Sequence, residues 1–366
     1  MTARIGASGF FVVLVICMVL GAGCLGSSVH SQVAASGISA PAVTGTLADF
    51  SGISEGNCTP VTITQTDGTP VTLPCHPQRI IVANANAAEM MIAIGANDKI
   101  VGVTQSTTNV SYIMDKIPQA ENIGDWQVPN VEKMLALHPD VVIAYASSKP
   151  KNIDQITAAN ITIVYLDCYR LSTLASDARA LGSLTSRAND AEGYARIVED
   201  TLAEVTGIIK TIPRADYPGV YSEMYSDYTV SGPGSGSDEQ LTLVGGESIA
   251  TDVTTSSARI STEWVVARQP EFIFKVISST NPKPLLEIHN DLITRTGWDD
   301  IPAVKTDRVY LFANDVQYGP RAYIGLVYMA QILHPDEFRD LHPRQMLDEY
   351  AGRYVTGTNK TGMVYP

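Results

Sequence analysis

Catalytic motifs are missing from this sequence of 366 residues. It contains no Gly-x-Ser-x-Gly nucleophile turn, no Walker-type phosphate loop, no His-Glu-x-x-His and no Cys-x-x-Cys pair. The sequence therefore disfavours hydrolases, nucleotide-binding enzymes, zinc peptidases and thiol redox proteins that depend on these motifs. We expect a protein with no catalytic residues and no turnover.

Histidine and positive charge are also scarce. Four of the six histidines precede a proline at an expected element boundary, namely His76, His138, His334 and His342. That distribution does not gather imidazoles into one site, so binding of a bare transition-metal ion is disfavoured. The 25 Lys and Arg are outnumbered by 38 Asp and Glu, which gives a net charge of -13. Because there is no basic patch, nucleic acid is not an expected partner.

One long apolar run stands at the N-terminus. It follows Arg4, spans residues 10–20 and leads through small residues to Cys24, which is the layout of a signal peptide over residues 1–24. Its end resembles the lipobox of prokaryotic lipoproteins, with Cys24 as the lipidated residue, although Gly21 replaces the usual aliphatic side chain. An uncleaved membrane anchor and simple secretion are the alternatives, and all three export the chain.

Residues 25–57 are rich in Ser, Ala, Gly and Thr and show no periodicity, which predicts a flexible tether. The next segment alternates in hydrophobicity over residues 61–73 and turns at Asp67-Gly68, which predicts a β-hairpin. Cys58 and Cys75 flank this hairpin. In an exported protein we expect them to form a disulfide; free thiols, or a pairing that involves Cys168, are the alternatives.

One sequence pattern, which we call the phrase, occurs twice in the chain. Residues 130–143 (NVEKMLALHPDVVI) and residues 261–274 (STEWVVARQPEFIF) each predict a short helix, a proline and a buried strand. A second, weaker similarity relates residues 89–96 to residues 239–246, and it predicts a similar helix ahead of each copy. The repeats predict two similar α/β lobes.

Strands and helices alternate around both copies, which predicts mostly parallel sheets covered by helices. We expect an α/β protein with two Rossmann-like lobes, residues 58–180 and 214–354, a ligand cleft between them, and a loose tail over residues 355–366. The first lobe has expected strands at 79–83, 100–103, 140–145 and 161–166, and helices at 87–94, 130–138 and 153–159. The second has expected strands at 219–224 and 309–312, and helices at 238–244, 285–296 and 323–333, besides the phrase.

Between the lobes, apolar residues recur every three or four positions from Leu181 to Ile212, and the first proline is Pro213. This spacing predicts one amphipathic interdomain helix over residues 181–213, about 32 residues and about 48 Å long. We interpret it as a stiff strut that joins the lobes. A coiled coil is the alternative.

Large or polar side chains follow several predicted strands, where open α/β sheets bind their ligands. The candidate ligand-binding residues are Asn86, Gln105, Trp126, Tyr169, Arg170, Tyr225, Lys275, Tyr318 and Arg321. Each has a structural alternative; Trp126 could fill the core, and Arg170 or Arg321 could pair with a carboxylate. The glycine-rich loop 231–237 could cradle an anion, although a mobile loop is the simpler interpretation.

Several segments in a fixed order carry a family resemblance: residues 77–82 (PQRIIV), 88–96 (AEMMIAIGA), 124–126 (GDW) and the repeated phrase. With them the chain resembles, from about residue 58 to residue 350, the substrate-binding proteins of iron-siderophore, haem and cobalamin importers. The resemblance implies two α/β lobes joined by a rigid helix and a metal chelate as cargo. It also implies no intrinsic cofactor and delivery to an ABC permease driven by a separate ATPase.

In cobalamin-binding members of that family, one glutamate on each lobe docks on arginines of the permease. The matching positions here are Glu132 and Glu247, which could instead be ordinary helix-end carboxylates. Trp126 matches an aromatic position of the cobalamin binders, whereas Arg170 and Arg321 would suit carboxylates of a siderophore or an oxyanion.

The sequence therefore predicts the substrate-binding component of an ABC importer, a monomer anchored through a lipid or an N-terminal segment to the outer face of the cytoplasmic membrane. The expected cargo is a ferric siderophore; cobalamin, haem and molybdate or tungstate are the alternatives. The competing classes are an extracellular enzyme or redox protein on a similar two-lobe fold, and a surface adhesin without an enclosed cleft.

Overall fold

The computed structural model describes residues 58–354 and 364–366. The predicted signal peptide, the lipidation candidate Cys24 and the predicted tether lie outside these residues. Within the described part, no helix has both the length and the apolar character needed to cross a membrane.

The N-terminal lobe is built on a parallel five-stranded sheet, as predicted. Its strand order is β5 (Glu121–Asn122), β4 (Ile100–Val103), β3 (Ile80–Val82), β6 (Val141–Ala144) and β7 (Ile163–Tyr165). Successive side chains alternate between the two faces, so Ile80 and Val82 enter one apolar cluster while Ile81 enters another. Both faces are buried, which explains why these strands read as continuous apolar runs.

Helices cover this sheet, and two of them begin at side-chain caps. They are α1 (Ala85–Ala93), α2 (Gln105–Thr108), α3 (Ser111–Met114), α4 (Val131–Ala136) and α5 (Ile153–Ala158), with a 3-10 turn η1 (Asn97–Lys99). Asn84 caps α1 and Asn130 caps α4 through their side-chain oxygens.

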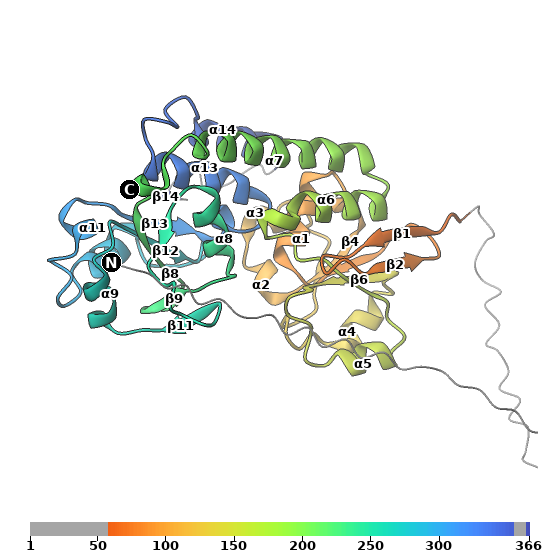
Figure 1. Ribbon diagram of the computed structural model, residues 1–366. Helices are drawn as coiled ribbons and strands as arrows, with labels where there is room; N and C mark the ends of the chain where they lie inside the picture. Colours follow the sequence, from red (N-terminus) through yellow and green to blue (C-terminus); the bar gives the residue numbers. More distant parts are fainter. Residues whose placement is uncertain (1–57, 355–363) are drawn as a thin grey trace, which may run out of the picture. The chain divides into compact units, whose positions relative to one another are not determined.

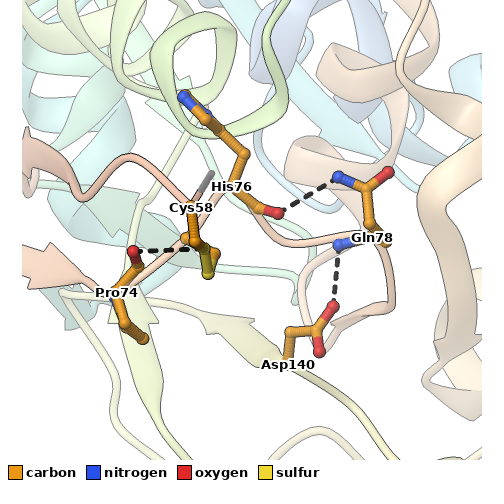
Figure 2. The surroundings of a disulfide bond; sticks show 6 residues. Cys58, Pro74, His76, Gln78 and Asp140 are labelled. Carbon is orange, nitrogen blue, oxygen red and sulfur yellow. Dashed lines mark hydrogen bonds between the residues drawn. A yellow bond between two sulfur atoms is a disulfide. The ribbon is translucent and has the colours of Figure 1, made fainter. Parts of the chain in front are cut away.

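The predicted hairpin precedes the sheet and is closed by the predicted disulfide. Strands β1 (Val61–Thr64) and β2 (Pro70–Leu73) pair antiparallel, and Cys58 is bonded to Cys75 with their Cα atoms 5.2 Å apart. Figure 2 shows the disulfide beside the loop that enters β3. There the Gln78 backbone N–H donates to Asp140 Oδ2 at 2.7 Å, which ties the base of the hairpin to the sheet.

The predicted single interdomain helix is wrong in its first part. The structure has two helices, α6 (Leu171–Thr185) and α7 (Ala188–Ile209), which lie side by side in Figure 1. The chain reverses at Ser186, whose φ of 63° is left-handed and ends α6. The apolar periodicity continues through the turn because both helices bury one face in the same core, so spacing alone did not reveal the break. Helix α7 is about 33 Å long.

The C-terminal lobe contains a seven-stranded mixed sheet. Its order is β11 (Ser257–Arg259), β9 (Thr229–Ser231), β8 (Gly219–Glu223), β12 (Phe272–Ile277), β13 (Val309–Ala313) and β14 (Val364–Tyr365), and β10 (Glu247–Ser248) also pairs with β8. Strands β8, β12 and β13 are parallel, whereas β9, β11 and β14 are antiparallel additions that the sequence did not predict. Because Val364 and Tyr365 form β14, the predicted loose tail is wrong at its end.

The helices of this lobe largely follow the prediction, with three omissions, two of which are helices of four residues. They are α8 (Gly236–Leu243), α9 (Thr262–Arg268), α10 (Leu285–Ile293), α11 (Pro302–Lys305), α12 (Asn314–Gln317), α13 (Ala322–Leu333) and α14 (Pro343–Tyr354), with 3-10 turns η2 (Arg214–Asp216) and η3 (Gly319–Arg321). Helix α14 was not predicted, although it buries Leu347 and Tyr350 in the core.

The repeated phrase has one structure in both lobes. Asn130 and Ser261 cap the helices α4 and α9, and a strand follows each helix. His138 and Gln269, at the same position of the phrase, both have a left-handed φ of 45° before the proline. The largest apolar cluster joins the two lobes, since it includes Ile80 of the first lobe and Phe274 of the second.

The close crossing of α6 and α7 yields a prediction about Gly182. A Cβ at this position would lie 2.3 Å from the Ala191 Cβ and 3.0 Å from the Arg187 carbonyl oxygen. We expect Gly182→Ala to lower the free energy of unfolding by about 1–3 kcal/mol, measured by urea denaturation.

Gly193 is the matched control, because it lies in α7 with no atom within 4 Å of the added Cβ. Gly193→Ala should raise the free energy of unfolding by up to about 1 kcal/mol through helix propensity alone. Equal effects at the two glycines would contradict the close packing of α6 against α7.

Candidate functional site

Buried polar side chains tie together the loops that follow the strands of the N-terminal lobe. Asn84 is fully buried, and its side-chain oxygen accepts from the backbone N–H groups of Asn86 (2.9 Å) and Ala87 (3.3 Å). Its side-chain nitrogen donates to the carbonyls of Leu166 (2.7 Å) and Asp167 (3.0 Å). Asn84 therefore joins the loop after β3 to the loop after β7.

The hairpin supports the same loops. Asp167 Oδ1 accepts from the backbone N–H groups of Ala146 (2.8 Å) and Ser147 (3.0 Å), which follow β6. The Thr66 hydroxyl, at the hairpin tip, accepts from the Asp167 N–H at 2.8 Å and donates to Asp177 Oδ1 at 2.8 Å. The loops after β3, β6 and β7 are thus held in one hydrogen-bonded platform.

Four aromatic side chains of both lobes form a continuous row at this platform. The ring centroids of Trp126 and Tyr145 are 5.5 Å apart, those of Tyr145 and Tyr169 6.3 Å, and those of Tyr169 and Tyr318 6.5 Å. All three contacts are edge-to-face, the favourable geometry for aromatic pairs. We call these four residues the aromatic row; each residue is half-buried.

Tyr145 is the member that the sequence prediction missed. It directly follows β6, so the rule that selected Tyr169 after β7 would also have selected it. Burial raises the pKa of Tyr145 and of Tyr318, so both phenols are neutral hydroxyls at physiological pH. The row therefore presents aromatic edges and hydroxyls without charge.

Asn86 and Gly319 bring the two lobes into contact beside the row. Asn86 Nδ2 lies 3.4 Å from the Tyr145 hydroxyl, and the Tyr318 hydroxyl lies 2.8 Å from Ser237 Oγ. Gly319 has a left-handed φ of 79°, and a Cβ there would lie 2.7 Å from Asn86 Oδ1. Only glycine allows this approach of the two lobes.

Two of the predicted ligand-binding cations are paired with carboxylates in the interior. Arg321 is 1% exposed, and its guanidinium contacts Glu89 Oε1 at 2.7 Å and Asp315 Oδ2 at 3.4 Å. Lys275 is 5% exposed and bonds Glu223 Oε1 at 2.6 Å. For Arg321 this pairing is the structural alternative considered from the sequence.

Arg170 is half-buried next to the row. Its Nε lies 3.3 Å from the Tyr169 hydroxyl and its Nη1 3.4 Å from the Gly234 carbonyl of the glycine-rich loop. In that loop the Gly234 N–H donates to Asp238 Oδ2 at 2.9 Å, and Ser235 caps α8. At least one backbone N–H of the loop therefore already donates to a carboxylate of the chain, which weakens the interpretation of the loop as an anion cradle.

The remaining candidates are exposed. Gln105 Nε2 donates to Thr108 Oγ1 at 3.0 Å. Tyr225 is 49% exposed, and its hydroxyl bonds the Asn314 side chain close to Tyr318. Within residues 58–354 and 364–366, no three His, Cys, Asp or Glu side chains gather in a way that could hold a metal ion.

The predicted docking residues are both at the surface. Glu132 is the second residue of α4, and Glu247 lies on β10, where it pairs with Arg214 at 3.3 Å. The position equivalent to Glu132 in the second copy of the phrase is Glu263, the second residue of α9, which is also exposed. Two carboxylates of the C-terminal lobe, Glu247 and Glu263, are therefore candidates for the docking residue that corresponds to Glu132.

Two α/β lobes with an aromatic row at the ends of their strands define a protein of the two-lobe binding class. The profile of the periplasmic binding protein family matches residues 80–316, and the chain belongs to that family. The resemblance found in the sequence, to the substrate-binding proteins of iron-siderophore, haem and cobalamin importers, is thereby confirmed.

Relatives and solved structures agree with this assignment. The chain is 29% identical over 290 residues to an uncharacterised ABC transporter substrate-binding lipoprotein of Bacillus subtilis, covering 77% of this chain and 88% of the relative. It is 25% identical over 286 residues to a cobalamin-binding protein of Halobacterium salinarum, covering 75% and 74%. The fold is similar to that of a molybdate periplasmic binding protein of Haemophilus influenzae, with a TM-score of 0.69, 19% identity and coverage of 80% and 97%.

The contact between hairpin and platform yields a prediction about pH. Burial, the largest effect, raises the pKa of Asp177 to about 6 from 3.8, although hydrogen bonds from Cys168 and Thr66 oppose it. The folded state thus favours protonated Asp177. Its contribution to stability is complete below pH 3.8 and is lost as the pH rises through 6, by about 3 kcal/mol.

Asp177→Asn cannot titrate and should remove this dependence. The difference in unfolding free energy between the variant and the wild type, from urea denaturation at pH 4 to 7, should therefore change by up to about 3 kcal/mol. Parallel curves over this range would contradict the burial of an ionisable Asp177.

Proposed function

We propose that this protein is the substrate-binding component of an ABC importer and that its cargo is a corrinoid such as cobalamin. The observation that carries the proposal is the aromatic row, which presents four uncharged, half-buried rings from both lobes. Large apolar macrocycles gain most from aromatic edges and faces, whereas anionic chelates need free cations.

The placement of the cations favours a corrinoid over a ferric siderophore, the cargo first expected from the sequence. Arg321 pairs with buried carboxylates, and Lys275 lies in the wall of a separate cavity, where it pairs with Glu223 and Asp227. Among the predicted cations, Arg170 is the one that contacts a member of the row. The cobalamin-binding relative from Halobacterium salinarum supports the same choice. A ferric siderophore remains the second candidate, because Arg170 could contact one of its oxygens.

The proposed protein is exported, held at the outer face of the cytoplasmic membrane through the N-terminal segment, and acts as a monomer without turnover or intrinsic cofactor. The lipoprotein relative from Bacillus subtilis supports the anchor. Cargo passes to a permease that a separate ATPase drives, and the surface carboxylates Glu132 and Glu247 dock on it.

Cargo identity is tested by tryptophan fluorescence with cyanocobalamin, haemin, a ferric catecholate, a ferric hydroxamate and molybdate. We expect saturable quenching by cyanocobalamin with a dissociation constant of about 1 μM or lower. Trp126→Leu should weaken binding about tenfold, because the row loses its terminal ring. Trp264→Leu, which removes a tryptophan that lies against Arg268 outside the row, is the control.

Tight binding of another member of the panel without cyanocobalamin binding would replace the corrinoid. Silence from the whole panel would contradict cargo binding at the row.

Docking is tested by charge reversal in a strain that depends on this protein for cobalamin uptake. Glu132→Lys and Glu247→Lys should each lower uptake at least tenfold while cyanocobalamin affinity stays unchanged, because the surface ion pair of Glu247 with Arg214 is weak and can be exchanged. Glu263→Lys is the comparison. Loss of uptake in Glu263→Lys but not in Glu247→Lys would move the second docking residue to the repeat-equivalent position, and normal uptake in all three variants would exclude carboxylate docking.

A further inference from the structure

A charged cavity opens next to the aromatic row in the C-terminal lobe. Its volume is about 280 Å³, and its walls include Tyr225, Asp227, Lys275, Ser278, Asn281 and Arg295. Tyr225 lines the cavity, and its phenol is close enough to Tyr318 of the row for the two to interact electrostatically. Lys275 belongs to β12 and Ser278 follows it, so the cavity lies at the strand ends where α/β sheets bind ligands.

Two cations are fixed in the wall of this cavity by one buried carboxylate. Glu223 is fully buried; its Oε1 bonds Lys275 Nζ at 2.6 Å, and its two oxygens accept from Arg295 at 2.7 and 2.9 Å. The Tyr221 hydroxyl and the Tyr228 N–H also donate to Glu223 Oε2, at 2.8 and 3.0 Å. Glu223 is therefore saturated and immobile, and it holds both cations in place.

The second carboxylate on these cations is of a different kind. Asp227 Oδ1 contacts Lys275 Nζ at 3.0 Å and an Arg295 nitrogen at 2.7 Å, but the Asp227 side chain is 65% exposed and lies on the loop between β8 and β9. Within the described chain its carboxylate has no further hydrogen bond or ion pair. Asp227 thus contacts both cations from a surface loop, and all three residues line the cavity.

From this arrangement we infer that Asp227 is a replaceable occupant of an anion subsite, and that the phosphodiester of a bound corrinoid takes its place on Lys275 and Arg295. The exchange of one singly charged oxygen anion for another conserves the charge of the cluster, while Asp227 returns to water. The cations need no rearrangement, because Glu223 and the Tyr228 and Trp298 rings, 4.4 and 4.7 Å from the Arg295 guanidinium, already hold it. The inference rests on the proposed corrinoid cargo.

A pair of corrinoids isolates the phosphodiester, since cyanocobalamin carries it and dicyanocobinamide lacks it. In the full chain we expect Asp227→Asn to bind cyanocobalamin at least threefold more tightly than the wild type, as the competing charge is gone, and to bind dicyanocobinamide unchanged. Lys275→Met, where it folds, should abolish the preference for cyanocobalamin. Both affinities are measured by calorimetric titration.

Asp300→Asn is the control for charge, because it removes one acidic side chain and one surface ion pair, with Lys305 at 2.8 Å, elsewhere in the same lobe. Three results would overturn the subsite. They are an equal change in affinity for both corrinoids in Asp227→Asn, no change in affinity in Asp227→Asn, or the same change in Asp300→Asn as in Asp227→Asn.

Failure of the proposed function has a separate signature, in which neither corrinoid binds the wild type. The subsite is then decided by thermal stability in inorganic phosphate. Greater stabilisation of Asp227→Asn than of Asp300→Asn supports the anion subsite, and equal stabilisation overturns it.

Discussion

The buried ion pair between Glu89 and Arg321 fixes one lobe to the other. Glu89 belongs to α1 of the N-terminal lobe, and its carboxylate accepts from Arg321 of the C-terminal half and from the Tyr112 and Tyr350 hydroxyls at 2.9 and 3.0 Å. Removing one partner of such a pair leaves an uncompensated buried charge, at a cost of about 3–5 kcal/mol. The aromatic row crosses the lobes at this junction, so its rings are held in a fixed arrangement.

The weaker sequence similarity, between residues 89–96 and residues 239–246, has a structural counterpart at this junction. Glu89 and Glu239 occupy equivalent positions of α1 and α8. Glu89 reaches Arg321, and Glu239 Oε1 accepts from the Ser172 N–H at the start of α6, at 2.8 Å. Each lobe thus sends a carboxylate from the same helix into the junction. The repeated sequence forms a similar scaffold in each lobe, and the equivalent residues Glu89 and Glu239 connect the two lobes.

Much of the scaffold was predictable because its signals are local. The hairpin, its disulfide, the parallel strands and both copies of the phrase follow from alternation, turn residues and apolar runs. The turn at Ser186 was missed because helices on both sides of it bury the same periodic face. The pairing of Arg321 with Glu89 could not be predicted for a different reason: the two residues are 232 positions apart, and no local pattern reveals such a pairing. Tyr145 directly follows a strand and could have been selected from the sequence, but it was overlooked. The proposed role of Asp227 as a replaceable occupant of the anion subsite could be inferred only from burial and distances.

The central claim is that an uncharged aromatic row, held by a rigid junction, binds a corrinoid. The most direct measurement is a crystal structure of the protein with cyanocobalamin. We expect the corrin ring in contact with Trp126 and Tyr318, with the Glu89–Arg321 pair still at 2.7 Å. A corrin ring bound away from the row, or a broken Glu89–Arg321 pair in the complex, would contradict it.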